Sequence, residues 1–475
     1  MTASSAAQRS EWTERARLPV DVEVALRRQP LPGRFPRMAQ RAQTLIDAQN
    51  VLELEPLNFL GGTESDLASD PAFYVQPPPL DEGDDGLPGP GPAESIRDQL
   101  LQHARPLKLF FSGHVGSGKS TQINKLAADK QLQDAFSIIL LRIEGGQAPF
   151  LDAAQLLFLI AGVIFQFGLD QKLLTENAKW KRILLELDTQ IYGPTGTVAK
   201  DGALAAEFNL LLVKLRADLK VNEHSRRQFR ELGETKQNLL IDLLKALTLD
   251  IENSLVAQSR HHSLLLLIDD LDKVRTPEQQ KDIFNTNLSS LLALPFRVLL
   301  TVPTGVVFGP NRVEVRRALE HLYPLRVLVK APQSYDPERA FIPDSDTFFS
   351  KALHQRVEPG LFEDEAVRLA TIYSGGVLRD FFRLLHTAVR VARNNGLDVV
   401  DHRALRGAIR DERRRESAGL LAQDYAALLA IHQTHAMAKD EDRRYLDESR
   451  VLECYNDKTW YEVSPLLWKL LEPQD

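Results

Sequence analysis

The chain is almost free of cysteine and of any apolar leader. Cys454 is the one cysteine among 475 residues, so no disulfide bond can form within the chain. The first residues, Met1 to Arg17, are polar and charged and lack the apolar stretch of a signal peptide. These two absences exclude a disulfide-stapled secreted domain. We therefore expect the protein in the reducing cytoplasm.

Long apolar runs are scarce as well. One stretch, residues 153–169 with the sequence AAQLLFLIAGVIFQFGL, has about the length of a single membrane span. It contains Gln155 and Gln166 and is bounded by Asp152 and Asp170. This stretch follows an apolar segment at 137–143 that is expected to be a strand, and in an α/β fold the chain returns to its sheet through a helix that packs on it. We therefore expect a buried helix and no membrane span.

Positive charge does not dominate the chain. It has 58 Lys and Arg against 65 Asp and Glu, a net charge of −7 with histidine neutral. This balance argues against a protein that coats nucleic acid with its whole surface, but it leaves room for a local basic face. His261 and His262 have no cysteine or spaced acidic residue beside them, so no metal site is predicted there.

The most informative stretch is an apolar strand at 107–111 that runs into FSGHVGSGKST and then a helix. Glycines at this spacing let backbone N–H groups turn inward around a phosphate at a helix N-terminus. Lys119 would reach the β- and γ-phosphates, the Ser120 hydroxyl would bind Mg²⁺, and Thr121 would support the α-phosphate side. The alternative is a plain glycine turn. The predicted phosphate-binding residues are Gly113, His114, Val115, Gly116, Ser117, Gly118, Lys119, Ser120 and Thr121.

A second apolar strand, residues 262–269, ends in carboxylates. Continuous apolar character is typical of a parallel strand that is buried on both faces. Asp269 would hold Mg²⁺ through water, and Asp270 would polarise the attacking water. Asp272 would bind the local backbone or orient the other two. An ordinary buried strand with a polar exit is the alternative.

Two further positions are candidates for sensing a γ-phosphate. The apolar strand at 296–302 includes Thr301 and is followed by Thr304, either of which could contact that phosphate; a threonine satisfied by its own backbone is the alternative. Arg379 follows a Ser-Gly-Gly turn and should lie in the first turn of a helix, from which it could reach back to the nucleotide. A surface arginine is the alternative. The predicted catalytic residues are thus Lys119, Asp270 and Arg379.

The order of apolar and polar segments predicts an α/β fold in which a parallel P-loop NTPase sheet with helical insertions is followed by a helical lid and a small winged-helix domain. An apolar stripe at 229, 232, 239, 240, 243, 247 and 251 predicts one buried helix face in the insertion. The first 75 residues show no recognisable chemistry. The predicted domains are 1–92, an N-terminal extension with a Pro/Gly-rich acidic linker; 93–332, the core with an insertion at 171–260; 333–412, the lid; and 413–475, the winged-helix-like domain with a hairpin at 451–463.

Together, the segments FSGHVGSGKST, LLLLIDDLDK, VLLTVP and SGGVLRDFFRLL resemble the AAA+/STAND side of the P-loop ATPases, near the KAP-type and origin-recognition-like ATPases, over roughly residues 95–465. This resemblance implies an ATPase whose nucleotide state controls assembly or the exposure of a partner surface. AAA+ enzymes usually have Glu where this chain has Asp270, and KAP proteins usually insert paired membrane helices, which we do not find. Arg312, Arg316 and Arg317 lie where a trans-acting arginine finger often sits, but none is assigned.

The leading hypothesis is a cytoplasmic ATP- and Mg²⁺-dependent switch that hydrolyses ATP slowly and acts in a homo-oligomer or with a partner effector. ATP is favoured over GTP because the guanine-reading motif N-K-x-D is absent. A role in bacterial anti-phage defence or signalling follows by analogy only. The alternative is an ATP-dependent DNA-binding initiator or loader, because the arginine-rich segment 379–415 adjoins the predicted winged helix. A nucleotide-locked scaffold with negligible hydrolysis is the third possibility.

Overall fold

The computed structural model divides into two compact units. Unit 1 comprises Met1–Arg27, His103–Lys108 and Lys130–Leu300, and unit 2 comprises Arg28–Gln102, Leu109–Asp129 and Thr301–Asp475. The structure describes residues 22–25, 41–53, 56–60, 69–78, 90–143, 151–174, 233–258, 263–274, 276–307, 313–331, 334–456 and 458–473, together with scattered positions between 180 and 189.

The larger sheet has the strand order β1-β3-β4-β5-β2-β6. β3 pairs in parallel with β4, β4 with β5, and β2 with β6, whereas β1 is antiparallel to β3. This is the α/β class that the sequence predicts. The strands are β1 (Val22–Ala25), β2 (Lys108–Gly113), β3 (Phe136–Arg142), β4 (Ser263–Asp269), β5 (Arg297–Thr301) and β6 (Leu319–Leu322).

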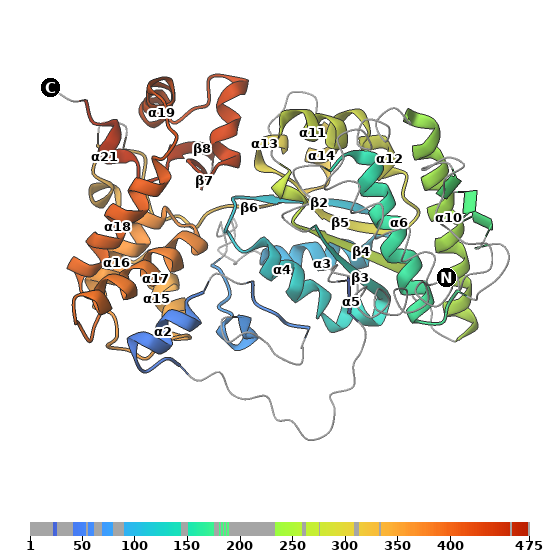
Figure 1. Cartoon of the computed structure of the whole chain (residues 1–475), viewed down its shortest axis with the longest axis horizontal. Helices are drawn as coiled ribbons and strands as arrows, with labels where there is room; N and C mark the ends of the chain where they lie inside the picture. Colours follow the sequence, from blue (N-terminus) through green and yellow to red (C-terminus); the bar gives the residue numbers. More distant parts are fainter. Residues whose placement is uncertain are drawn as a thin grey trace, which may run out of the picture. The chain divides into compact units, whose positions relative to one another are not determined.

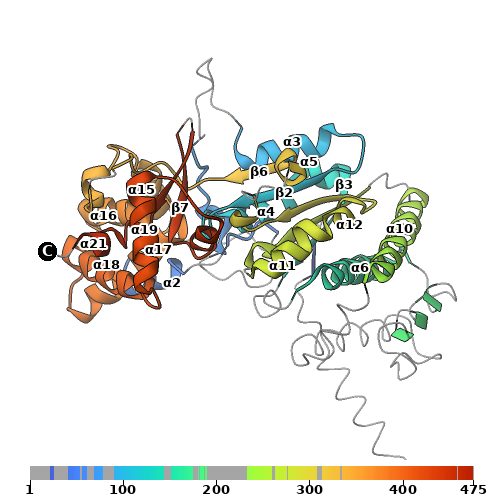
Figure 2. The ribbon, with the colours of Figure 1, turned by 90° about the horizontal axis from the view of Figure 1, so that it is seen from above.

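In the described part of unit 1, two long helices lie beside the strands. α6 (Ala153–Asp170) begins with a capping box formed by Asp152 and Gln155. By length and composition α6 could cross a membrane, but 78% of it is buried within the protein, as predicted for a core helix. α10 (Gly233–Ala257) lies beside α6 (Figures 1 and 2) and buries the predicted stripe at 240, 243, 247 and 251. Residues 229, 232, 261 and 262 lie outside the described part. The shorter helices of unit 1 are α5 (Lys130–Ala135), α11 (Pro277–Lys281) and α12 (Leu288–Leu292).

Unit 2 contains a layer of helices packed on one apolar core, which we call the lid (Figure 1). It consists of α15 (Thr347–His354), α16 (Asp364–Ser374), α17 (Leu378–Asn394) and α18 (His402–Glu416). The other helices of unit 2 before the C-terminal region are α2 (Leu45–Val51), α3 (Pro92–Gln102), α4 (Lys119–Ala127), α13 (Thr304–Val307) and α14 (Val313–Arg317).

The C-terminal region of unit 2 contains the antiparallel hairpin that the sequence predicts, β7 (Val451–Asn456) and β8 (Lys458–Val463). Two helix predictions need correction. The helix expected to run from Glu416 to Ala436 is α19 (Ala422–Thr434), since Gly419 takes a φ of 81° in the break after α18. The helix expected to start at Ser464 is α21 (Trp468–Leu471), and α20 (Arg444–Asp447) precedes the hairpin. The expected domain boundary at 412/413 falls inside α18, and the winged helix stays a prediction.

Candidate functional site

The predicted P-loop joins the end of β2 to the start of α4. Gly113, Gly116 and Gly118 have φ angles of 150°, 90° and 105°, which side chains other than glycine rarely tolerate. Gly118 precedes α4 without a side-chain cap, and a Cβ there would meet no described atom within 4 Å. Glycine is therefore needed at 118 for its backbone angle rather than for space. A helix N-terminus behind such a loop fits the binding of a phosphate.

A buried cation lies inside this loop. The Lys119 ammonium donates hydrogen bonds to the carbonyl oxygens of Gly113, at 2.7 Å, and of His114, at 3.0 Å. Its side chain is buried, with 5% exposure. A phosphate oxygen carries more charge than these carbonyl oxygens and would form a stronger hydrogen bond with the ammonium. The donor set of the loop therefore fits an anionic phosphate group.

His114 is a neutral member of the loop. Burial, followed by the positive charges of Lys119 and Arg379, lowers the pKa of its ring to about 4. Nδ1 lies 3.0 Å from the carbonyl oxygen of Val115, and the backbone of Val451 lies beside the ring. An uncharged ring can stay buried among these cations, whereas an imidazolium could not.

The remaining hydroxyl groups of the loop support its shape. Ser117 Oγ donates to the carbonyl of His114 at 2.8 Å. Thr121 Oγ1 accepts a hydrogen bond from the backbone N–H of Leu57 at 3.3 Å. Ser120, the predicted Mg²⁺ ligand, is half-buried at the start of α4.

The lid reaches the P-loop at the position the sequence singles out. Gly375 ends α16 in the left-handed conformation, with a φ of 60°, and α17 starts three residues later. The N–H of Arg379 donates to the carbonyl of Gly116 at 3.1 Å. A Cβ on Gly116 would lie 2.5 Å from the Cβ of Arg379. The first turn of α17 thus rests directly on the glycine loop, while the sensor role of Arg379 stays a prediction.

The two threonines expected at the end of β5 differ in their contacts. Thr301 is fully buried in the last position of the strand. Thr304 Oγ1 donates to the carbonyl of Gly113 at 3.1 Å. The Thr304 hydroxyl is thus bonded directly to the backbone of the P-loop.

The C-terminal region also contacts the loop and its flanking elements, which the sequence did not indicate. The N–H of Gly305, at the start of α13, donates to Asp447 Oδ1 at 3.1 Å. His321 Nε2 on β6 lies 3.0 Å from Glu453 Oε2 on β7, and both side chains are buried. Short polar strands and single carboxylates carry no pattern from which these pairs could have been found.

The predicted acidic residues lie in unit 1, at the end of β4. The Asp269 side chain is 2% exposed and its Oδ1 accepts the N–H of Asp270 at 2.8 Å. Asp270 takes a φ of 66°, and its carboxylate pairs with Lys273 at 2.8 Å. A left-handed aspartate is uncommon and costs about 1 kcal/mol or more, which often marks a functional position.

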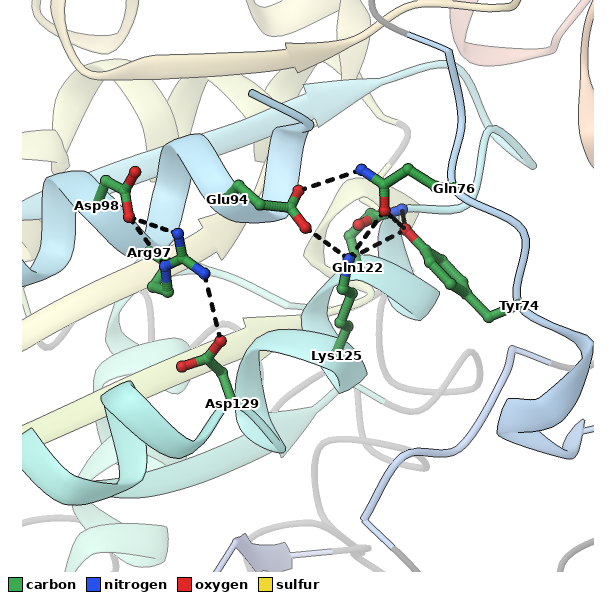
Figure 3. Close-up of polar contacts among 8 residues, drawn as sticks. All are labelled: Tyr74, Gln76, Glu94, Arg97, Asp98, Gln122, Lys125 and Asp129. Carbon is green, nitrogen blue, oxygen red and sulfur yellow. Dashed lines mark hydrogen bonds and ion pairs between the residues drawn. The ribbon is translucent and has the colours of Figure 1, made fainter. Parts of the chain in front are cut away.

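An N-terminal segment that the sequence left without a role also lies along the P-loop helix. Asn124 Nδ2 of α4 donates to the carbonyl of Leu57 at 2.8 Å. Figure 3 shows Tyr74 and Gln76 directed at Lys125, which also pairs with Glu94 of α3. One turn away, Arg97 bridges Asp98 and Asp129 in the same view.

The arginine-rich segment is largely engaged within the protein. Arg383 pairs with Asp380, Glu412 and Glu416. Burial raises the pKa of Asp380 to about 6, against the opposing charge of Arg383. Other arginines of this segment are also paired: Arg390 and Arg414 with Asp411, Arg406 with Glu338, and Arg415 with Glu412. Arg413 donates to the carbonyl of Leu466.

The three arginines in the region of a possible arginine finger differ in their surroundings. Arg316 Nε donates to the carbonyl of Val307 at 2.9 Å, and Arg317 is exposed. Arg312 lies outside the described residues. None of the three is assigned a role.

A parallel α/β sheet with a glycine-rich loop between strand and helix is the architecture of P-loop NTPases. No protein-family model matches the sequence, and no curated protein matches it significantly. Among solved structures, the chain is similar to Drosophila ORC bound to DNA, at 13% identity over 98% of this chain and 99% of that one, with a TM-score of 0.38. It is also similar to Cdc6p from Pyrobaculum aerophilum, at 11% identity over 84% of this chain and 96% of that one, with a TM-score of 0.35. The Aeropyrum pernix ORC2 protein, solved as ADPNP and ADP complexes, is similar at 13% identity over 84% of this chain and 96% of that one, with a TM-score of 0.38.

Proposed function

We propose that the chain binds ATP with Mg²⁺ at its P-loop and acts as a nucleotide-dependent molecular switch. The observation that carries this proposal is the bond from Arg379 N–H to the Gly116 carbonyl, which joins the lid to the glycine loop. The backbone of Val451 beside His114 brings the C-terminal hairpin to the same loop. Binding of a phosphate that changes the conformation of the loop would therefore act on both the lid and the C-terminal hairpin.

The sequence motifs suggest a separate role for each residue of the proposed nucleotide site. Lys119 would exchange its two carbonyl partners for phosphate oxygens, and the N–H groups from Gly113 to Thr121 would cradle the phosphate. Ser120 and Asp269 are the proposed Mg²⁺ ligands, Asp270 the proposed water-orienting group. Bound Mg²⁺ would neutralise charge on the phosphates.

We propose slow hydrolysis. Aspartate is one methylene shorter than the glutamate usual at position 270, and its carboxylate is held by Lys273 at 2.8 Å. Orienting a water would require this pair to open. The pace of a switch, rather than that of a motor, suits such a site. Control of a homo-oligomer or partner effector, in a cytoplasmic defence or signalling role, remains an analogy.

ATP binding and turnover test the proposal directly. Labelled ATP should bind wild type, and Lys119→Ala should lose that binding. Asp270→Asn should keep binding and lose phosphate release. Lys351→Ala, which removes an exposed lysine of α15, serves as the matched control and should behave as wild type. Equal ATP binding by wild type and Lys119→Ala would refute the proposal.

A second candidate is ATP-licensed binding to DNA. Arg403, Arg410 and Arg414 are exposed on α18 at spacings of seven and four residues, which place them on one helix face. Such a row of guanidinium groups suits phosphate contacts. The nearby Asp411, 4.0 Å from Arg414, weakens the row. DNA is present in the Drosophila complex named above, and a binding measurement on this chain decides the matter.

A further inference from the structure

The described N-terminal residues 41–53, 56–60 and 69–78 form a segment that we call the N-terminal strap. At one end it is bonded to the lid. The N–H of Ala42 donates to the carbonyl of Arg356 at 2.8 Å, and the N–H of Glu358 returns a bond to Ala42 at 2.9 Å. The apolar face of α2 is buried in the same core as the lid helices. The strap is thus an integral part of the lid layer.

Arg356 is the main side chain of this junction. Its guanidinium lies 4.7 Å from the ring centre of Phe73, in the strap, and 4.8 Å from that of Phe382, in α17. Nη1 donates to the carbonyl of Val51 at 3.0 Å. The residue is 6% exposed, and burial lowers its pKa to about 10. A buried arginine between two rings is held in one position.

The other end of the strap holds the P-loop helix. Leu57 is bonded through its N–H to Thr121 and through its carbonyl to Asn124, which is 2% exposed. Tyr74 contributes a ring 4.7 Å from the Lys125 ammonium and a hydroxyl that accepts from Gln122 at 3.4 Å. The first turns of α4 are therefore fixed by the strap at several points (Figure 3).

The path between the two ends is short. Phe73 contacts Arg356 on the lid side, and the next residue, Tyr74, contacts α4. Val51 and Leu57, which bond Arg356 and Thr121, are separated by five residues. The single peptide unit between Phe73 and Tyr74 joins two packed side chains, and it can transmit a displacement because close-packed groups cannot deform continuously.

We propose that the N-terminal strap couples the first turns of the P-loop helix to the lid, with Arg356 as its positioning residue. This coupling is separate from the direct bond between Arg379 and Gly116. It rests on the proposed nucleotide binding and adds a second route by which the lid controls how long a nucleotide stays bound. Arg356 acts through Phe73 and Val51 and does not reach the phosphates.

The experiment measures the dissociation rate of a fluorescent ATP analogue from the full chain. Arg356→Met keeps much of the side-chain volume but removes the charge and the bond to Val51. It should speed dissociation by about 2- to 30-fold, the range of mutations along a coupling network. Arg368→Met is the matched control, since Arg368 lies 5.5 Å from the Phe341 ring in the lid but has no contact with the strap among the described interactions. It should leave the rate unchanged.

A double-mutant cycle with Tyr74→Ala tests the link itself. Once Arg356→Met has broken the lid end, removal of Tyr74 at the helix end should add less than it does alone. Additive effects, or an unchanged rate in folded Arg356→Met, would overturn the proposal. If Arg356→Met does not fold, Tyr74→Ala should still increase hydrogen exchange at lid residues 347–358, and unchanged exchange there would overturn it. Absence of nucleotide binding by wild type would instead refute the proposed function.

Discussion

At the scale of single residues, Gly116 is the position where the loop and the lid meet. Its carbonyl accepts the N–H of Arg379, and its φ of 90° excludes most other residues. The absence of a side chain allows the two backbones to approach. Glycine is therefore required at position 116 both for its backbone angle and for the close approach of Arg379, and experiment can separate these two requirements.

Gly116→Ala should weaken ATP binding and lower the free energy of unfolding. The new Cβ would lie 2.5 Å from the Arg379 Cβ, in addition to the backbone cost of about 1–2 kcal/mol. Gly360→Ala is the matched control, because Gly360 has a φ of 100° and no described atom within 4 Å of an added Cβ. It carries the backbone cost alone. Equal losses of ATP affinity in the two variants would show that the lid contact does not matter.

The buried pair of His432 and Glu462 in the C-terminal region gives a prediction about pH. His432 Nδ1 lies 2.7 Å from Glu462 Oε1, its Nε2 lies 2.8 Å from the Ser334 carbonyl, and both side chains are fully buried. Burial opposes the charged ring, but the hydrogen bond and charge of Glu462 outweigh it and raise the pKa of His432. Since a carbonyl only accepts, Nε2 must carry hydrogen.

A raised histidine pKa means that the folded state holds its proton more tightly than the unfolded state. The stabilisation is complete below the unfolded pKa of about 6.5 and is lost as pH rises through the higher folded value. The free energy of unfolding should therefore fall above about pH 6.5, by at most about 1.4 kcal/mol per pH unit. Urea unfolding across pH 6 to 9 measures this. His432→Gln should flatten the slope, whereas His402→Gln, at an exposed site, should keep it; an unchanged slope in His432→Gln would contradict the assignment.

At the scale of elements, the C-terminal hairpin and α20 are attached near the loop by polar bonds. Gly305 N–H to Asp447 is one of them, at 3.1 Å. Asp447→Ala should loosen α20 from α13 at a cost of about 1–3 kcal/mol, with faster hydrogen exchange over residues 444–456. Asp447→Asn keeps an acceptor oxygen and should retain most of the protection. If both variants exchanged like wild type, the bond would not hold the two elements.

The elements found from the sequence share strong patterns. β2 to β5 are apolar runs with turn residues at their ends, and the P-loop and hairpin have fixed spacings. β6 has the sequence LEHL, which is too short and too polar to stand out, and becomes a strand only by pairing with β2. The strap was missed because two of its bonds to α4 run through the backbone of Leu57, and its side-chain contacts join Tyr74 and Gln76 to residues of α4 that lie 48 to 51 positions away in the sequence. Backbone contacts between distant segments leave no trace in residue type.

At the scale of the whole molecule, the predicted site residues are distributed over both units. Asp269 and Asp270 belong to unit 1, whereas the P-loop after β2, the lid and the hairpin belong to unit 2. Within unit 2, the loop is linked to the lid through Arg379 and to the strap through Thr121. A ligand on the loop is therefore in a position to affect distant surfaces of that unit.

The choice between a protein-directed switch and a DNA-binding initiator depends on the exposed arginines of α18. If DNA is the partner, replacing Arg403, Arg410 and Arg414 by Gln should weaken binding and lower the salt slope by about 0.9 per lost phosphate contact. Arg339→Gln, which removes an arginine with 81% side-chain exposure elsewhere in unit 2, is the control for lost charge. Fluorescence anisotropy with labelled duplex over a salt series measures this. A similar effect of the control would indicate attraction by overall charge alone.

Hydrogen exchange of the C-terminal hairpin upon addition of ATP and Mg²⁺ tests the central claim most directly. If loop occupancy is coupled to the hairpin through His114 and Val451, exchange over residues 444–463 should change in wild type. It should not change in Lys119→Ala, which lacks the phosphate-binding cation. ATP bound to wild type with unaltered exchange in this segment, or the same change in Lys119→Ala, would contradict a switch operated from the P-loop.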